Sequence, residues 1–558
     1  MFDGAARKLS QLARDPVLRH WLAGRLLGRW PGEPAFTPHR PPYLTGALPL
    51  DIEAPDPPAP FQTLDSAPPK SPLVLSLPGE DVRVDPGGEA ALFERPFADT
   101  ETLLALHRFA WVPVGDPDPA WVAALWRAWA GRFATPGEGW AWHPYTAAER
   151  AVNVLRFARV HGLPGRPRET LQLLCAHAPA IARRLEYFGD HHTSNHLANN
   201  GRGLFVLGLE LGLRCATDMG GRILIEEGER IIHASGVLRE GSSHYHCLVT
   251  RNYVECWLAA RAHARPEAGA LEAIAGRALA VIPALTLAAG MPLIGDISPD
   301  CPPDLPNGYW AGEEARAVTD LRDAVGPADG DALAAGGWLR AGFGPWDGLW
   351  HAAPGGWSPM PGHGHQDLGA FELHYGAERV FVDPGRGAYG EEGEAARYRS
   401  GVVHNTLRID GHDPYPPNKP YYSDLFRRRF GPPPETTRTD TGIEMTHHGY
   451  SRFAGVGQVR RRWEFSGRGF TLHDRVEGSG SGRVIMRVLV TPHEVNADAG
   501  GVTIQGKAAA WRVRFEGECT LRPLTSWQAY GSGKPATAIE ITAMAALPWE
   551  DAIAVEAT

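Results

Sequence analysis

The sequence lacks several features that would assign it directly to a common class of protein. Its 558 residues include only six cysteines, which form neither a CxxC pair nor a dense disulfide framework. Scattered cysteines of this kind indicate free thiols in a reducing compartment. No P-loop occurs, so this common phosphate-binding motif of nucleotide-dependent enzymes is missing. The net charge of −9 excludes a general nucleic-acid-binding protein, which needs a basic surface.

Long apolar runs are also missing. The N-terminal segment is interrupted by charges at Arg14, Asp15, Arg19 and Arg25, unlike the apolar stretch of a signal peptide. The longest apolar stretch, ALAVIPALTLAAGMPLIG, falls short of the ~20 residues that span a bilayer. It also contains two prolines, so we expect a buried helix there. These absences predict a cytoplasmic protein, with the periplasm or the cell envelope as the alternative.

The first 30 residues are basic and amphipathic. Two interpretations of this segment remain open: peripheral contact with an anionic membrane surface, or a helix packed on the main body of the protein. The basic residues and leucines that define the pattern are Arg7, Lys8, Arg14, Arg19, Arg25 and Arg29, and Leu9, Leu12, Leu18, Leu22 and Leu26.

Composition divides the chain into three parts. Residues 1–95 contain the basic helix and a proline-rich arm. Residues 96–337 show the apolar spacing of at least seven helices with short loops. Residues 338–558 turn to short alternating runs, each expected as a separate strand, such as GAFELHYG, GFTLHDRVEG and GRVIMRVLV. Helices first and strands second predict an α+β multidomain protein, with a helical bundle, solenoid or toroid followed by an antiparallel β-sandwich.

Three motifs in the β part carry residues with catalytic or metal-binding chemistry. PGHGHQD holds His363 and His365, whose rings share one face if a strand already begins there. Asp383 ends the next predicted strand before Pro-Gly, and His404 opens the one after it. Because the three segments lie on consecutive strands, His365, Asp383 and His404 are a candidate zinc site.

Two further motifs lie in the helical part. NHLANN, residues 195–200, places amides and an imidazole at a helix start, where such groups often act as caps. EGSSHYH, residues 240–246, sets Tyr245 between two histidines. A tyrosine in that setting suits proton transfer, although a tyrosine ring is as often a packing residue.

The order NHLxNN, EGSxHYH, GHGHxD, VDPG and HN resembles the heparinase II/III family of polysaccharide lyases. The segment Trp142-His143-Pro144-Tyr145 followed by Arg150 is also similar to the helical domain of that family. The motifs cover roughly residues 95–420, and the domain order extends the match to the whole chain. The resemblance implies an N-terminal incomplete (α/α) toroid, a C-terminal antiparallel β-sandwich and a cleft between them.

The resemblance also implies a function, the β-elimination of uronic-acid-containing polysaccharides or oligosaccharides. Such an enzyme removes the C5 proton of a uronate and expels the 4-linked oxygen, which requires donors that stabilise the developing charge. Asn195 or His196 would neutralise the carboxylate, Tyr245 would be the acid and also a candidate base, and His363 would be the other base or a carboxylate partner. Zinc on His365, Asp383 and His404 would be structural, and no organic cofactor is expected. The candidate substrate contacts are Arg202, Arg397, Arg399 and Asn199.

Two other functions are compatible with the same sequence. A glycoside hydrolase on this architecture would need paired carboxylates, and Glu240 and Asp367 are the candidates within the motifs. A non-catalytic polysaccharide-binding protein of envelope polysaccharide assembly is the second alternative.

Overall fold

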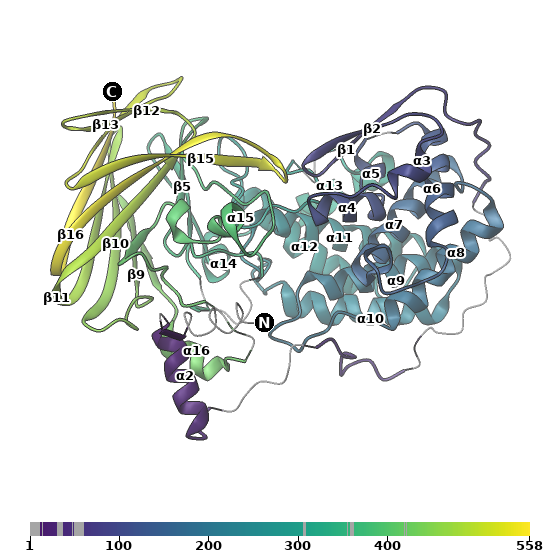
Figure 1. Cartoon of the computed structure of the whole chain (residues 1–558), viewed down its shortest axis with the longest axis horizontal. Helices are drawn as coiled ribbons and strands as arrows, with labels where there is room; N and C mark the ends of the chain where they lie inside the picture. Colours follow the sequence, from purple (N-terminus) through teal and green to yellow (C-terminus); the bar gives the residue numbers. More distant parts are fainter. Residues whose placement is uncertain are drawn as a thin grey trace.

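The computed structural model describes residues 12–13, 15–30, 37–46, 48, 61–115, 117–304, 308–353, 355–357, 362–417, 419 and 421–558. A helical part and a β part lie next to each other along the longest axis of the molecule (Figure 1). The order agrees with the α+β organisation predicted from the sequence, since the strands of the β part begin at Trp338 after the last helix of the helical part ends at Ala335.

The helical part begins with a β-hairpin and continues with helices, most of which are joined by short loops. The hairpin strands are β1 (Leu73–Leu77) and β2 (Glu80–Val84). The helices are α3 (Glu89–Leu92), α4 (Thr100–Arg108), α5 (Val112–Gly115), α6 (Pro119–Phe133), the 3₁₀ helix η1 (Trp140–Trp142), α7 (Pro144–His161), α8 (Pro167–Ala182), α9 (Asn195–Leu211), α10 (Arg214–Ile231), α11 (Ser243–Ala262), α12 (Ala268–Leu285), α13 (Gly312–Val325) and α14 (Gly330–Ala335).

The helix boundaries follow from capping residues. Ser194 caps α9, and the Ser242 side chain accepts a hydrogen bond from the Tyr245 amide at the start of α11. Helices α9 and α10 can pack closely because Gly208 has no side chain. A Cβ atom at that position would overlap Thr217. Helix α11 packs against α12, and α7 packs against α8 and α9. The arrangement brings the first turns of α7, α9 and α11 to one end of the helical part.

Helix α12 contains only the first part of the apolar stretch for which the sequence predicted a buried helix. The helix ends at Leu285, and the rest of the stretch, residues 286–295, is a loop. Within the described residues α12 is the one helix long and apolar enough to cross a membrane, judged by length and composition alone. Its residues Leu271, Ile274 and Leu279 belong to a buried cluster shared with α11 and α13. The helix is therefore part of the core of the helical domain.

The β part contains two antiparallel sheets. Four strands form the smaller sheet in the order β3 (Trp338–Phe343), β4 (Trp346–His351), β5 (Phe371–Tyr375) and β6 (Glu378–Phe381). The ten-stranded sheet contains β7 (Leu407–Ile409), β8 (Glu435–Arg438), β9 (Gly442–His447), β10 (Val456–Ser466), β11 (Gly469–Thr491), β12 (Glu494–Asp498), β13 (Gly501–Gln505), β14 (Ala510–Arg514), β15 (Glu518–Ala529) and β16 (Ser532–Ala557). Two short helices, α15 (Gly393–Arg397) and α16 (Asp424–Phe430), and the 3₁₀ helix η2 (Gly401–Val403) lie in the loops.

Aromatic side chains form the core between these two sheets. Trp346 and Phe371 of the smaller sheet share one buried cluster with Trp463, Phe470 and Trp511 of the larger sheet. Burial of a large aromatic side chain stabilises a fold by roughly 1.5–3 kcal/mol, so this cluster holds the sheets face to face. The predicted β-sandwich is thereby confirmed.

One detail of the strand prediction was wrong. The runs GFTLHDRVEG and GRVIMRVLV were expected as separate strands, but both belong to β11, which pairs with β16 along its length. The pairing shifts register on either side of Gly480, and Gly478, Gly480 and Gly482 all have positive φ. Glycine tolerates that conformation, so the segment bends at bulges and continues as one strand.

The described part of the basic N-terminal segment is the helix α2 (Pro16–Leu26), capped by Asp15. Val17, Leu18 and Trp21 are buried in the core cluster of the β part, and the Trp21 ring lies 4.3 Å from that of Tyr421. The helix therefore packs on the main body, one of the two interpretations left open (Figure 1). Arg7, Lys8, Leu9 and Arg14 lie outside the described residues, and membrane contact stays a prediction.

Candidate active site

A cavity of about 460 Å³ lies between the helical part and loops of the β part. Asn195, His196 and Tyr245, from the first turns of α9 and α11, line its helical side. His363, from the loop before β5, lines the opposite side. The structure thus brings together, in one cavity, the four residues predicted as catalytic, with Arg399 at the same cavity.

The amide of Asn195 is available for a ligand. The residue is 1 % exposed, yet neither its Oδ1 nor its Nδ2 atom has a hydrogen-bond partner in the protein. A buried polar group without a partner costs about 1–3 kcal/mol, and such a group at a cavity wall is typical of a binding site. Its backbone N–H donates to Glu240 Oε1 at 2.7 Å, which fixes the position of the first turn of α9.

His196 is held differently from its neighbour. Its Nδ1 lies 2.7 Å from Glu186 Oε1. Burial alone lowers the pKa of His196, but the nearby Glu186 carboxylate more than offsets this and holds that pKa above its ordinary value. The pKa of Glu186, which burial raises, is in turn held below its usual range by His196. His196 therefore forms an ion pair with Glu186.

Tyr245 and His363 are stacked on each other. Their ring centroids lie 3.4 Å apart with an interplanar angle of 10°. The Tyr245 hydroxyl lies 2.7 Å from the hydroxyl of Tyr389, which itself donates to the carbonyl oxygen of Ile297. Burial raises the pKa of Tyr245 well above its usual value, and the hydrogen bond with Tyr389 lowers it part of the way back. The free site thus holds Tyr245 as a protonated phenol at neutral pH.

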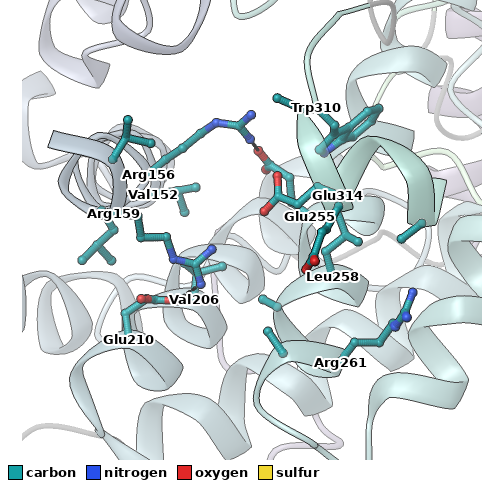
Figure 2. Close-up of a pocket in the computed structure, with 17 residues that line it drawn as sticks. Val152, Arg156, Arg159, Val206, Glu210, Glu255, Leu258, Arg261, Trp310 and Glu314 are labelled. Atoms are coloured by element: carbon teal, nitrogen blue, oxygen red, sulfur yellow. Dashed lines mark hydrogen bonds and ion pairs between the residues drawn. The ribbon is translucent and has the colours of Figure 1, made fainter. Parts of the chain in front are cut away.

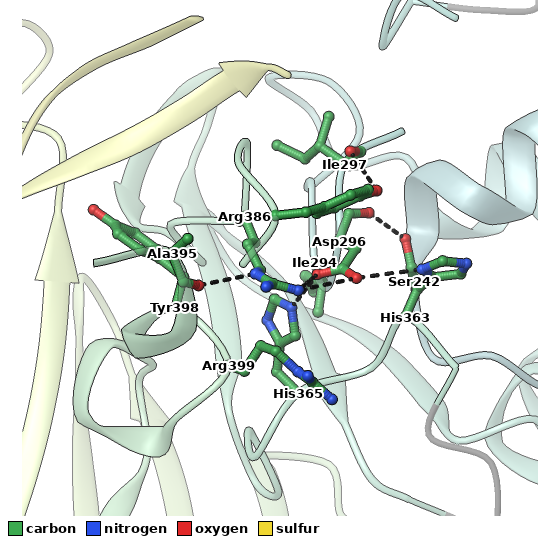
Figure 3. Close-up of polar contacts among 12 residues, drawn as sticks. Ser242, Ile294, Asp296, Ile297, His363, His365, Arg386, Ala395, Tyr398 and Arg399 are labelled. Atoms are coloured by element: carbon green, nitrogen blue, oxygen red, sulfur yellow. Dashed lines mark hydrogen bonds and ion pairs between the residues drawn. The ribbon is translucent and has the colours of Figure 1, made fainter. Parts of the chain in front are cut away.

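Asp296 is the carboxylate that positions the imidazoles (Figure 3). It lies in the loop after α12, with Oδ2 3.3 Å from His363 Nδ1 and Oδ1 2.9 Å from His365 Nε2. Arg386 donates to the same carboxylate at 3.1 Å. Burial raises the pKa of Asp296, but hydrogen bonds from the two histidines dominate and hold it well below its usual range. Asp296 and Glu240, which approaches His363 Nε2 at 3.4 Å, therefore fix the His363 ring from the helical domain.

The arginines and asparagine predicted as substrate contacts divide into two groups. Arg399 lines the cavity and pairs with Glu391 at 3.1 Å. Arg202 is fully buried between Glu149 and Glu255, and Asn199 donates to the Tyr145 carbonyl oxygen inside the same helical core. Neither of these two lines the cavity, because both side chains are used within the domain.

Arg397 also lies away from the cavity. It borders a separate shallow groove with Val402 and Glu540, and its guanidinium lies 3.6 Å from Glu394. The structure therefore places only Arg399, of the four predicted contacts, where a substrate in the cavity would reach it.

The three predicted zinc ligands lie near one another beneath the cavity. His404 Nδ1 lies 2.7 Å from Asp383 Oδ2, and its Nε2 lies 2.9 Å from the Tyr398 carbonyl oxygen. The His365 ring centroid is 5.1 Å from that of His404, and its buried Nδ1 has no hydrogen-bond partner. Within the described part of the chain, however, no three His, Cys, Asp or Glu side chains stand close enough to hold a metal ion.

A second cavity of about 550 Å³ lies at the other ends of the same helices (Figure 2). It is lined by residues from the last turns of α7, α9 and α11, including Arg159 and Glu210, which pair with each other. None of the predicted site residues lines it. Although larger, this cavity contains no candidate for proton transfer comparable to Tyr245 and His363.

Sequence reasoning did not identify Asp296, Arg386 or Tyr389. Asp296 lies in a loop with no recognisable motif, so only the fold reveals it. Arg386 and Tyr389 follow VDPG in the glycine-rich segment GRGAYG, which is a signal of close backbone approach. Trp140, which is 51 % exposed and lines the edge of the cavity, was also missed. It lies two residues before the motif Trp142-His143-Pro144-Tyr145.

Comparison with known proteins agrees with this architecture. The sequence profile described as heparinase II/III-like, C-terminal, matches residues 325–552. A crystal structure of heparinase III superposes with a TM-score of 0.61 and 18 % identity, covering 83 % of this chain and 78 % of that one. A second heparinase III structure superposes with a TM-score of 0.53 and 15 % identity, covering 84 % of this chain and 80 % of that one. No curated protein sequence matches the chain. The expected toroid-plus-sandwich fold is thereby confirmed.

Proposed function

We propose that this chain, whose residues 325–552 form a heparinase II/III-like C-terminal domain, is a polysaccharide lyase that cleaves uronic-acid-containing chains by β-elimination. The main support for this proposal is that Asn195 and Tyr245 of the helical part and His363 of the β part line the same cavity. The fold alone would not specify this reaction, because one fold supports many functions. The unpartnered amide and the stacked phenol and imidazole supply the groups that the reaction needs.

The carboxylate of the reacting uronate is assigned to Asn195. Removal of the C5 proton moves negative charge onto that carboxylate, and a preorganised donor there contributes most to catalysis. The free amide of Asn195 supports this role, whereas Nδ1 of its alternative, His196, is already paired with Glu186. The first turns of α7, α9 and α11 also direct the positive ends of their helix dipoles toward the cavity.

Proton transfer is assigned to Tyr245 and His363. In the elimination a base takes the C5 proton, the C4–O bond breaks, and a C4=C5 double bond forms as the departing oxygen gains a proton. The protonated phenol of Tyr245 supports its role as the acid, and His363 is the base or the partner of the carboxylate. Because the two rings are stacked, both proton transfers take place on one face of the sugar. Trp140, exposed at the cavity edge, offers an aromatic surface for a sugar ring.

A hydrolase mechanism has less support. Glu240 and Asp367, the carboxylates considered for it, do not line the cavity. Glu240 is fully buried and accepts a hydrogen bond from the backbone N–H of Asn195, and Asp367 pairs with His351 at 3.0 Å. The carboxylates that do line the cavity include Asp296 and Asp300, both of which are held by arginines. No free pair of carboxylates is thus available among the described residues of the cavity wall.

The proposed activity is tested by incubating the protein with acidic polysaccharides and following the ultraviolet absorbance of unsaturated uronate. A rise with the wild type that is lost in Tyr245→Phe supports the proposal. Tight binding without any rise would favour a non-catalytic polysaccharide-binding protein. The cytoplasmic location stays a prediction.

We also propose a structural Zn²⁺ held by His365, Asp383 and His404, whose side chains would have to move closer together around the ion than they stand in this structure. Support comes from the unused Nδ1 of His365 and from the Tyr398 carbonyl, which orients His404 as an outer-shell partner does. The ion would order the loop that presents His363. Metal analysis of the purified protein should give about one zinc per chain, lost in His404→Gln but retained in His447→Gln, whose histidine is buried elsewhere in the β part. An equal metal content in both variants would contradict the assignment.

A further inference from the structure

Among the described residues of the cavity wall, each arginine is already paired with a carboxylate of the protein. Arg108 lies 2.6 Å from Asp300 and 3.1 Å from Glu101. Arg386 lies 3.1 Å from Asp296. The third, Arg399, lies 3.1 Å from Glu391. The guanidinium groups therefore have little charge left to offer a bound anion.

The remaining wall residues do not restore a positive potential. The three arginines face four carboxylates, Glu101, Asp296, Asp300 and Glu391, and no lysine stands among the described residues that line the cavity. His196, the histidine with the raised pKa, has Glu186 as its own partner. His143 lies 3.6 Å from that same carboxylate. The cavity thus carries no excess of positive charge.

A bound sulfate group requires an unpaired cationic side chain, which the described part of the cavity wall does not provide. Sulfate keeps its negative charge at all physiological pH values, and proteins bind such oxyanions through charge-assisted hydrogen bonds from arginine and lysine. Placing an anion next to like charges is unfavourable. A sulfated sugar entering this cavity would lie close to Glu101, Asp300 and Glu391 without a free cation to compensate.

Binding the carboxylate of the reacting uronate requires less positive charge than binding a sulfate group. Asn195 supplies a neutral amide with no competing partner, and the first turns of three helices add only partial charges. Such a site can bind one carboxylate at the reacting sugar without binding additional anionic groups.

We propose that the substrate is an unsulfated uronic-acid polymer or oligosaccharide, in which the carboxylates are the sole anionic groups. The proposal rests on the lyase function proposed above and adds its substrate class.

The test compares polymers that differ only in sulfation. Unsulfated heparosan and its chemically sulfated derivative form one pair, and chondroitin and chondroitin 4-sulfate form a second. We expect kcat/KM for the unsulfated member of a cleaved pair to be at least about tenfold higher, which corresponds to 1.4 kcal/mol. Equal or faster cleavage of the sulfated member would overturn the substrate class and leave the lyase function intact. Failure to cleave any uronic-acid polymer would instead overturn the lyase function, and the substrate class with it.

A charge variant tests the physical cause. Glu391→Gln leaves Arg399 without its partner, so the ratio of sulfated to unsulfated kcat/KM should rise by about threefold, the scale of one exposed ion pair. Glu394→Gln is the matched control, because it releases Arg397 outside the cavity and should leave the ratio unchanged. The same ratio in both variants and the wild type would contradict the role of the paired arginines.

Discussion

The hydroxyl groups of Tyr245 and Tyr389 lie 2.7 Å apart, one from the helical domain and one from the β domain. This contact links the proposed acid to a residue that no motif identified. It also makes the chemistry of Tyr245 depend on how the two domains meet.

Replacing Tyr389 with phenylalanine should slow the reaction without preventing binding. The hydrogen bond between the Tyr245 and Tyr389 hydroxyls lowers the pKa of Tyr245, so its loss raises that pKa further. We expect kcat to fall about tenfold, the scale of one hydrogen bond to a charged group, with KM little changed. If Tyr245 also acts as the base, the acidic limb of the pH–rate profile should move to higher pH. Unchanged kcat and an unchanged profile would show that Tyr389 does not position Tyr245.

Asn195→Ala should separate activity from stability. The amide has no partner in the protein, so its removal should leave the thermal midpoint nearly unchanged while kcat/KM falls by about 10²–10³-fold, as for other oxyanion donors. Asn199→Ala is the control, since it removes hydrogen bonds to the Tyr145 carbonyl and from Arg202 and should lower the midpoint. Full activity in Asn195→Ala would remove this residue from the mechanism.

The His196–Glu186 pair should make stability depend on pH. A raised histidine pKa contributes stability below about pH 6.5, its unfolded value, and that contribution is lost as pH rises through the folded pKa. The lowered pKa of Glu186 contributes above about pH 4.3 and is lost as pH falls through its folded pKa. Glu186→Gln should therefore lower the thermal midpoint most between about pH 4.3 and 6.5, with a smaller loss at alkaline pH. A loss that is constant from pH 5 to 9 would contradict the pairing.

Arg202 should affect stability instead of substrate binding. Its replacement by methionine leaves Glu149 and Glu255 buried without their main partner, and breaking a buried ion pair costs about 3–5 kcal/mol of unfolding free energy. Denaturant titration measures this loss. The half-exposed Arg397, replaced in the same way, should change the free energy by less than about 0.5 kcal/mol. An increased KM with unchanged stability in Arg202→Met would return Arg202 to the substrate contacts.

The sequence allowed the architecture to be predicted because helical and strand periodicity differ. The family resemblance carried by its motifs pointed to four residues that the structure brings to one cavity, and their catalytic roles stay a prediction. The sequence did not distinguish Arg399 from Arg202, since a conspicuous arginine gives no indication of whether a carboxylate 53 residues away will neutralise it. Asp296 was missed for a related reason. Its role depends on the loop after α12 reaching His363 and His365 across the domain boundary, a long-range contact that no local pattern records. Strand β11 was predicted as two separate strands because the glycines at its bend resemble the glycines of a turn.

Elimination and hydrolysis give chemically different products, so the structure of the products distinguishes a lyase from a hydrolase. Elimination gives a non-reducing end with a C4=C5 double bond, so mass spectrometry should show fragments that lack one water relative to hydrolysis products, and proton NMR should show an alkene hydrogen. We expect these unsaturated ends with the wild type and their absence with Tyr245→Phe. Saturated ends that incorporate solvent oxygen would contradict it and identify the protein as a hydrolase.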